Sequence, residues 1–350
     1  MLRFGRAVLC ALLGTTLLFG ARHLGASAKA EPAPLKIGFL LDSLEVERWQ
    51  TDTQAFQKRA KELGAEVLLE TANGNDDVQY QQAQKLLNQG VKSLVIVPHD
   101  TDRAVQIVDL AKSRGVPVVS YDRLIRNSKI DFFVGVDSEK IGEIQAQSLV
   151  KLAPKGNYVL MEGSPTDSNA RLLREGQEKV LQPYVDRGDI KIVGDVWCAD
   201  WDPLEAYAKM AELIAADHGN ITAVVASNDG TAGGAVQALQ DAKLAGKVLI
   251  SGQDADLAAI IRLLKGTQTM TVYKPLSAQA IQAANVAVSL ANGKTPPTEQ
   301  SISVGKKNVP AFLDSVVVVT KDNVMQTVIK DGFQNLDTIK KSLPPDEWPK

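Results

Sequence analysis

Short polar clusters follow seven of the apolar, strand-like runs of this chain, at the point where each run ends. They combine Arg, Asp, Asn and Lys with Trp. The clusters are Glu47-Arg48-Trp49, Tyr121-Asp122-Arg123, Asp167-Ser168-Asn169, Asp200-Trp201, Asn228-Asp229, Gln253-Asp254 and Tyr273-Lys274. In parallel α/β sheets, ligands bind in the crevice beyond the carboxyl ends of the strands. We therefore expect these clusters to line one crevice.

The residue types in these clusters fit a small ligand that is rich in hydroxyl groups. A hydroxyl group is both donor and acceptor, and a buried one must be paired. Asp accepts, Arg and Lys donate, Asn does both, and hydrogen bonds to charged groups are roughly twice as strong as neutral ones. A flat indole can cover the C–H face of a sugar ring. The clusters therefore predict a monosaccharide site rather than a metal or phosphate site.

Several of these residues also have an ordinary structural explanation. Trp49 lies on the apolar stripe of an expected helix, so core packing explains it as well as ligand contact does. Trp201 lies between two aspartates ahead of a helix that starts at Pro203, which favours stacking on a ligand. The other structural alternatives are an i+4 pair with Asp52 for Arg48, a mutual pair for Asp122 and Arg123, helix caps for Asp229 and Asp254, and solvation for Lys274.

The sequence lacks the usual motifs of catalysis and of metal binding. The glycine-rich run 228–234 has neither GxxxxGK[ST] nor GxGxxG spacing, and there is no GxSxG elbow. Zinc sites recruit clustered His or Cys, whereas His99 and His218 are far apart and Cys198 is the one cysteine outside the first thirty residues. We expect a binding protein rather than an enzyme, with no cofactor, no metal, no intrachain disulfide, and with both histidines isolated on the surface.

The first thirty residues have the pattern of an export signal. Two arginines precede an apolar stretch at 8–19, and Ala26-Ser27-Ala28 and Ala28-Lys29-Ala30 are two small-x-small cleavage sites. The apolar stretch is shorter than the roughly 20 residues of a spanning helix, which disfavours an uncleaved anchor. Cys10 lies inside this stretch, which disfavours a lipoprotein. We predict cleavage near residues 28–30 and a periplasmic protein.

The charge of the chain excludes nucleic acid as a partner. The formal net charge is −2 and becomes −6 once the four basic residues of the signal are removed. There is no basic run to contact phosphates. An export signal also stands where a repressor of this size would carry its DNA-binding helices.

Strand and helix patterns alternate almost throughout the chain, as in doubly wound α/β proteins. The apolar runs are continuous rather than alternating, which is typical of a parallel sheet covered on both faces. The expected strands are 36–41, 67–69, 94–97, 116–120, 132–136, 158–161, 190–193, 223–227, 248–251, 268–273 and 316–319. The expected helices are 48–63, 77–88, 103–113, 139–152, 169–185 with a break near Pro183, 203–216, 230–242, 255–264, 276–291 and 322–329.

With these clusters the chain resembles the periplasmic sugar-binding proteins of ABC transporters, in the ribose/galactose-type group, and most of all those members that bind D-xylose. The matching stretches run nearly from end to end, and the last two are long and specific. They are Glu47-Arg48-Trp49-Gln50, 71–75, Tyr121-Asp122-Arg123, Gly163-Ser164-Pro165, Ala226-Ser227-Asn228-Asp229, Thr231-Ala232-Gly233-Gly234, 251–257 and 266–275.

The resemblance implies a set of sugar contacts that the hydroxyl chemistry had already marked. The contacts are Arg48, Asp122, Arg123, Asn169, Trp201, Asn228, Asp254 and Lys274, with Trp49 as an additional wall. Two positions depart from the family pattern. Ser168 stands where the family has Asn, and Cys198 is interpreted as a buried or half-buried free thiol.

The resemblance also implies the fold, an α/β type I periplasmic binding protein with two Rossmann-like, doubly wound lobes joined by a three-segment hinge. The hinge crossings are expected near Asp137, Lys274 and Pro310. The implied parts are a signal peptide at 1–30, an N-terminal lobe of 31–137 plus 275–309, a C-terminal lobe of 138–274 plus 310–335, and a C-terminal tail of 336–350. The segment 343–350 carries three prolines, and we expect this segment to be loose.

These expectations amount to an exported, monomeric receptor that closes around D-xylose and docks on an ABC permease. Ribose, arabinose or glucose as the ligand is the alternative, and a chemoreceptor partner is compatible with either. A sugar-processing enzyme that uses Asp122 or Asp254 as its acid or base is the weaker alternative.

Overall fold

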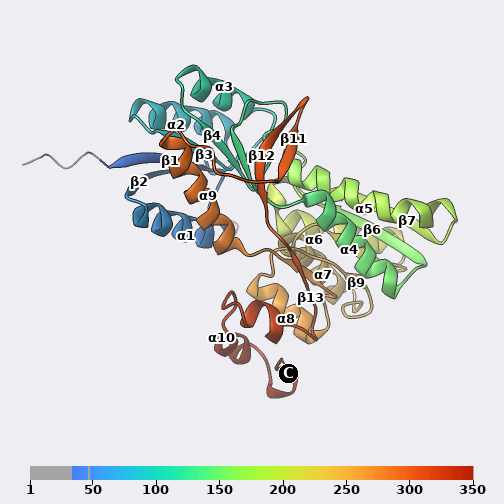
Figure 1. The fold of residues 1–350 in the computed structure, drawn as a ribbon. Coiled ribbons are helices and arrows are strands. Elements are labelled where there is room, and N and C mark those ends of the chain that lie inside the picture. The colour runs from blue at the N-terminus through green and yellow to red at the C-terminus, as the bar shows by residue number, and fades with distance from the viewer. Residues whose placement is uncertain (1–33, 46–47, 350) are drawn as a thin grey trace, which may run out of the picture. The chain divides into compact units, whose positions relative to one another are not determined.

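The computed structural model describes residues 34–45 and 48–349, and Figure 1 shows their fold. The predicted export signal with Cys10, and Glu47 of the first polar cluster, lie outside the described residues. Among the residues that are described, none of the helices has the length and apolar character needed to cross a membrane.

A seven-stranded sheet holds the first five strands of the chain and two late ones. Its order is β11-β12-β5-β4-β3-β1-β2, and all its pairings are parallel except the β11–β12 hairpin. Helices α1 and α9 cover one face, and α2 and α3 cover the other. The bounds are β1(Leu35–Leu41), α1(Arg48–Glu62), β2(Ala65–Thr71), α2(Asp76–Asn88), β3(Ser93–Ile96), α3(Val105–Ser113), β4(Val118–Tyr121), β5(Phe132–Gly135), α9(Leu276–Ala291), β11(Ser301–Val304) and β12(Lys307–Leu313).

A second, four-stranded parallel sheet has the order β7-β6-β8-β9. Helices α4 and α5 pack on one face, and α6 and α7 pack on the other. The bounds are α4(Ser138–Leu152), β6(Gly156–Glu162), α5(Ser168–Asp186), β7(Ile190–Trp197), α6(Pro203–Ala216), β8(Ala223–Ala226), α7(Asp229–Asp241) and β9(Leu249–Ile250), with a 3-10 turn η1(Ala199–Trp201) after β7.

A small antiparallel ladder of β10(Thr271–Tyr273) and β13(Val317–Val319) continues from the second sheet, because Gln253 bridges Val272. Its cluster of buried side chains also includes α8(Leu257–Lys265), η2(Met325–Ile329) and α10(Leu336–Lys341). The segment expected to be loose, 343–350, is anchored at its first residue. Ile339 and Leu343 lie four residues apart and pack into this cluster, so apolar burial anchors the segment.

Three connections join the two sheets: β5 to α4, β10 to α9, and β12 to β13. The first two lie at the expected crossings near Asp137 and Lys274. At the third, β12 pairs with β5 through Leu313, three residues beyond Pro310. The exact lobe boundaries remain a prediction.

After several strands, the chain enters the next helix through a turn in which an Asn or Asp side chain caps that helix. Asn75, Asp137, Asp167 and Asp202 each accept a hydrogen bond from a backbone N–H of the first helical turn, at 2.8–3.0 Å. Such caps satisfy N–H groups that the helix itself leaves unpaired. They fix where these strand-to-helix turns lie, and the turns at Asp167 and Asp202 lie at two of the polar clusters.

Helices α4 and α5 approach each other closely because glycines line their contact. A Cβ at Gly142 would lie 1.9 Å from the carbonyl oxygen of Leu173, and one at Gly176 would lie 2.0 Å from that of Glu139. α5 also continues past Pro183, where the sequence indicated a break. The β11–β12 hairpin, in contrast, was not predicted at all, because both of its strands are largely exposed or half-buried and so have no continuous apolar run.

The second sheet contains a fully buried carboxyl group at the end of β6. Glu162 accepts a 2.6 Å hydrogen bond from Ser227 Oγ on one oxygen, and the other has no partner among the described residues. Burial raises the pKa of Glu162 to about 8, and the Ser227 hydrogen bond opposes only part of this shift. The side chain is therefore protonated at neutral pH.

We predict that Glu162→Gln removes a pH dependence from the stability of the protein. The folded state holds a proton that the unfolded state releases above its ordinary pKa of 4.5. This contribution to stability is complete below pH 4.5 and is lost as the pH rises through about 8. Over this pH range the free energy of unfolding of the variant should rise relative to that of the wild type by about 1–4 kcal/mol. Thermal denaturation between pH 5 and 9 tests this, with the exposed Glu175→Gln as control; parallel curves for wild type and Glu162→Gln would contradict it.

Candidate functional site

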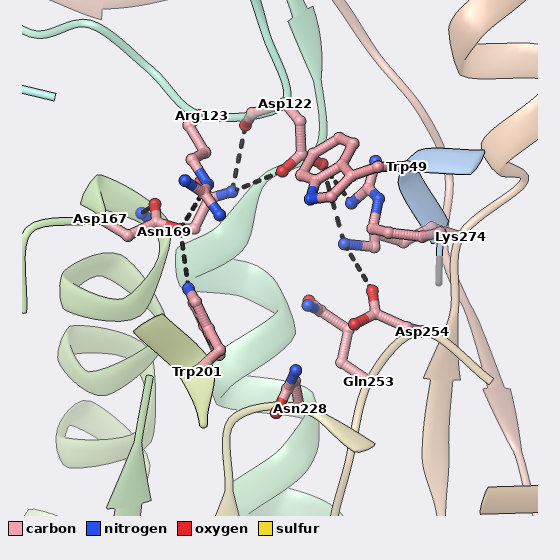
Figure 2. Close-up of a pocket in the computed structure, with 11 residues that line it drawn as sticks. Trp49, Asp122, Arg123, Asp167, Asn169, Trp201, Asn228, Gln253, Asp254 and Lys274 are labelled. Atoms are coloured by element: carbon pink, nitrogen blue, oxygen red, sulfur yellow. Dashed lines mark hydrogen bonds and ion pairs between the residues drawn. The ribbon is translucent and has the colours of Figure 1, made fainter. Parts of the chain in front are cut away.

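A polar pocket lies at the carboxyl ends of strands from both sheets, and its empty space, including solvent-filled space at its mouth, is about 360 Å³. All nine residues predicted as ligand contacts line it, together with Asp167 and Gln253 (Figure 2). The lining residues are Arg48, Trp49, Asp122, Arg123, Asp167, Asn169, Trp201, Asn228, Gln253, Asp254 and Lys274. Their strand-end positions explain why they meet, since parallel strands end at the same edge of a sheet.

Arg48 is the centre of one buried group of charges. Its Nη1 lies 2.6 Å from Asp122 Oδ1, and its Nη2 lies 2.8 Å from Asp52 Oδ2 and 3.1 Å from Gln279 Oε1. The i+4 pair with Asp52 therefore exists, and Arg48 lines the pocket as well. The pair with Asp52 holds one edge of the guanidinium, while Asp122 lies at the pocket.

The two carboxylates around Arg48 respond differently to burial. Burial disfavours the charge of Asp122, but Arg48 and Lys274 together lower the pKa of Asp122 to about 2. For Asp52, burial outweighs Arg48 and raises the pKa to about 6. Asp122 is thus the reliably charged acceptor in the pocket.

Arg123 joins the two sheets. Its Nη1 donates to Asp42 Oδ2 at 2.7 Å and to the Pro98 carbonyl at 2.8 Å, and its Nε lies 2.7 Å from Asp167 Oδ2. Asp42 follows β1 and Asp167 caps α5, so Arg123 links the first sheet to the second. The alternative that Asp122 and Arg123 pair with each other is wrong, because each has partners on other elements.

Asp42 also forms a hydrogen bond with His99. The ring Nδ1 of His99 lies 3.0 Å from Asp42 Oδ1, and this hydrogen bond raises the pKa of His99. The expectation of an isolated surface histidine is therefore wrong for His99. β1 and β3 are neighbours, so the residues that follow them meet. His218 is exposed, as expected.

Asn169 also spans the two sheets. Its Nδ2 donates to Asp122 Oδ2 at 3.0 Å and to the Asp122 carbonyl at 3.2 Å, and its Oδ1 accepts from Ser138 Oγ. Its amide is largely engaged within the protein. Asn169 positions Asp122 at least as much as it faces the pocket.

Lys274 and Asp254 form the side of the pocket next to the β10–α9 crossing. Lys274 Nζ lies 2.9 Å from Asp254 Oδ1 and 3.8 Å from Asp122 Oδ1. Lys274 is buried, so the alternative of a solvated lysine is wrong. Asp254 does not cap a helix either, because α8 begins only at Leu257.

Asn228, and not Asp229 as the structural alternative had it, caps the next helix. Asn228 caps α7: its Oδ1 accepts from Thr231 N at 2.8 Å and from Thr231 Oγ1 at 2.9 Å. This leaves its Nδ2 pointing into the pocket (Figure 2). Asp229 is buried and accepts from Gln268 Nε2 at 2.7 Å and from Thr271 Oγ1 at 2.8 Å. The helix start lies one residue earlier than predicted, so the cap is the asparagine.

Two indoles complete the walls. Trp49 has the guanidinium of Arg48 over its ring at 4.1 Å, and its Nε1, which points into the pocket, has no partner among the described residues. Trp201 is held by a 3.1 Å hydrogen bond from its Nε1 to Asp167 Oδ2. Both are buried, so core packing and pocket lining coincide for Trp49.

Asp167 and Gln253 are the two lining residues that were not singled out from the sequence, although both belong to the recognised clusters. Asp167 accepts from Trp201, from Arg123 and from the backbone N–H of Asn169, so it positions three parts of the pocket. Asn169, two residues further on, gives a stronger signal of ligand contact because its amide both donates and accepts. Next to Gln253, the charged Asp254 gives the stronger signal, because hydrogen bonds to charged groups are stronger.

The pocket offers mixed donors and acceptors between two apolar faces. Acceptors come from Asp122 and Asp254, and donors from Lys274, Asn228 and Trp49. Within the described residues no group of His, Cys, Asp or Glu has an arrangement that could hold a metal ion. Cys198 lies close to the Trp201 turn and is a buried free thiol, and burial raises its pKa to about 11. This arrangement suits a neutral, hydroxyl-rich ligand.

We predict that Gly163→Ala displaces the Trp201 indole and destabilises the fold. A Cβ at Gly163 would lie 2.3 Å from two ring carbons of Trp201, so the ring must move. Overpacking of this kind costs about 1–3 kcal/mol. Chemical denaturation and near-ultraviolet circular dichroism measure both effects. Gly230→Ala, whose Cβ comes no closer than 3.4 Å to a neighbour, is the control; equal stability and identical spectra for Gly163→Ala and wild type would refute the displacement.

Comparison with known proteins agrees with this geometry. The sequence matches the periplasmic binding protein domain over residues 37–295. It is 50% identical to the D-xylose-binding periplasmic protein of Escherichia coli K12 over 304 residues, 87% of this chain and 92% of that protein. It is 46% identical to the D-xylose-binding periplasmic protein of Haemophilus influenzae over 334 residues, 95% of this chain and 98% of that protein.

Solved structures support the same fold. An ABC transporter solute binding protein from Clostridium phytofermentans with bound β-D-glucose has a TM-score of 0.81 and 29% identity, and the match covers 87% of this chain and all of that one. These relatives are transport receptors rather than enzymes. The two-lobed α/β fold and the match over most of the sequence place this chain in the periplasmic binding protein family.

Proposed function

We propose that this protein is an exported receptor that binds D-xylose in the pocket between its two sheets and delivers it to an ABC permease. One observation carries the proposal. Side chains from both sheets converge on one small pocket with the acceptors, donors and flat apolar faces that a sugar requires. The 50% identity to a D-xylose-binding periplasmic protein supports xylose as the sugar.

The charges of the pocket match the hydroxyl groups of a pentose. The carboxylates of Asp122 and Asp254 accept hydrogen bonds, and the ammonium of Lys274 and the amide of Asn228 donate them. Trp49 and Trp201 provide the apolar faces for the C–H surfaces of the ring. A site that pairs every hydroxyl rejects an analogue lacking one by about 10⁴-fold. Specificity therefore comes from paired polar groups more than from size.

Closure around the sugar follows from the placement of these residues on two sheets. A ligand shifts an equilibrium between open and closed forms only through its preference for the closed form. A shift from 1:99 to 99:1 requires about 5.5 kcal/mol of such preference. Contacts with both sheets provide it, and contacts with one sheet do not. The crossings near Asp137 and Lys274, and the third one, expected near Pro310 and placed by the strand pairing just after Leu313, are the proposed hinge segments.

The remaining parts of the proposal concern location and partners. We infer that the signal peptide is cleaved near residues 28–30, that the mature receptor is a periplasmic monomer, and that an ABC permease accepts its closed form. A chemoreceptor is a compatible second partner. The alternative to xylose is another monosaccharide. The bound glucose in the Clostridium phytofermentans relative supports glucose as one such alternative, beside ribose and arabinose.

A thermal-shift screen against a panel of monosaccharides tests the proposal. A ligand at about 100 times its Kd stabilises the folded protein by about 2.7 kcal/mol. D-xylose should give the largest rise in Tm, ahead of glucose, ribose and arabinose. A larger rise with another sugar would reassign the ligand. No rise with any sugar would refute a monosaccharide receptor.

We predict that Asp254→Ala lowers the affinity for D-xylose by about 100-fold or more. The substitution removes a charged acceptor and leaves Lys274 without its 2.9 Å partner in a buried site. Isothermal titration calorimetry measures the affinity, and circular dichroism checks that the fold persists. Asp241→Ala, an exposed carboxylate on α7, is the control. Wild-type affinity in Asp254→Ala would exclude this residue from the site.

A further inference from the structure

A second set of contacts joins the two halves of the protein outside the pocket. Thr101 donates from both its backbone N and its Oγ1 to the carbonyl oxygen of Thr166, each at 3.1 Å. Arg171 Nη2 donates to Thr101 Oγ1 at 2.9 Å, and Arg171 Nη1 lies 3.4 Å from Asp102 Oδ2. None of these four residues lines the sugar pocket.

The contacts connect one loop of each sheet. Thr101 and Asp102 lie between β3 of the seven-stranded sheet and α3. Thr166 lies between β6 of the four-stranded sheet and α5, and Arg171 lies on the first turn of α5. Each bond therefore crosses from one half to the other and must break when the halves separate.

Hydrogen bonds within each loop hold its shape independently of the other loop. Asp100 Oδ1 accepts from the backbone N of Asp102 at 2.8 Å and of Arg103 at 3.0 Å. On the other side, Asp167 N donates to Ser164 O at 3.1 Å, and the hydroxyls of Ser164 and Thr166 are 3.0 Å apart. Little further ordering is needed when the loops meet, so most of the interaction free energy is available to favour the closed form.

Burial makes the Thr101 contacts significant. The side chain of Thr101 is fully buried although it belongs to a surface loop, and Thr166 O is the acceptor for both of its donors. Hydrogen bonds in such a shielded place are stronger than exposed ones. The exposed Arg171–Asp102 pair contributes less, as surface ion pairs usually do.

We propose that Thr101, Asp102, Thr166 and Arg171 form an interlobe clasp that sets sugar affinity without touching the sugar. The inference rests on the proposed function, in which binding requires the closed form. The apparent affinity of a receptor scales with the fraction of molecules in the binding-competent state. A contact made only on closure therefore changes the affinity for every sugar by the same factor, whereas a pocket residue changes the ratio between sugars.

The test compares Thr101→Val, Arg171→Gln and the double variant with wild type. Valine keeps the shape of Thr101 but removes the hydroxyl that joins Thr166 and Arg171. Arg174→Gln is the matched control, because Arg174 lies on the same helix and its ion pairs within the described part of the chain are with Glu178 and Asp195 of the same half. Calorimetry gives Kd for D-xylose and for the second-best sugar of the panel, and stopped-flow tryptophan fluorescence gives the dissociation rate.

The clasp predicts that Thr101→Val raises Kd by about threefold to tenfold, mainly through faster dissociation, and that the double variant exceeds either single one. The ratio of Kd between the two sugars should stay constant in each variant. Without sugar, the Tm of each clasp variant should fall no further below the wild-type Tm than that of Arg174→Gln does. An unchanged Kd, or an altered ratio between sugars, would overturn the clasp and leave the receptor function standing. If the wild type binds no sugar, it is the proposed function that fails.

Discussion

The pocket depends on the pairing of charges that are almost completely removed from water. Three cations, Arg48, Arg123 and Lys274, are buried there, and each lies within 3 Å of at least one carboxylate. Burial of an unpaired ion costs several kcal/mol even after relaxation. Each cation therefore needs a partner fixed by the fold, and the strand-end loops are where these partners stand. The ion pairs hold the side chains in place before a ligand arrives, which reduces the ordering cost of binding.

Some of these ion pairs lie within one half of the molecule, and one of them joins the two halves. Arg48 with Asp52, and Arg123 with Asp42, are contacts within the seven-stranded sheet and its helices, so they persist if the two halves separate. The pair of Arg123 with Asp167 crosses between the halves. An arginine with partners on both sides keeps one of them in either state. The two halves can then part without leaving a bare buried charge, and this limits the free-energy difference that a sugar must overcome.

Much of this arrangement follows from sequence because the parallel topology brings strand ends together. A polar cluster after each apolar run was enough to place nine residues in one pocket. What the sequence did not reveal depends on shifts of one residue or on contacts between distant segments. The cap of α7 falls on Asn228 rather than on Asp229, because the helix starts one residue earlier than expected. His99 meets Asp42 only because β1 and β3 are neighbours, which no local pattern encodes.

Backbone strain is the feature of the pocket that the sequence predicts least. Asp122, Trp201 and Asp254 all have positive φ, with values of 61°, 61° and 100°, although none is a glycine. Such conformations cost about 1–3 kcal/mol each and persist only where surrounding contacts enforce them. Around Asp254 the enforcing group is the buried carboxylate of Asp229, which accepts from Asp256 N at 3.1 Å and from Thr271 Oγ1 at 2.8 Å. The strained turn directs Asp254 towards Lys274 and the pocket. Asp229, which does not line the pocket, therefore stabilises the backbone conformation on which the contact between Asp254 and Lys274 depends.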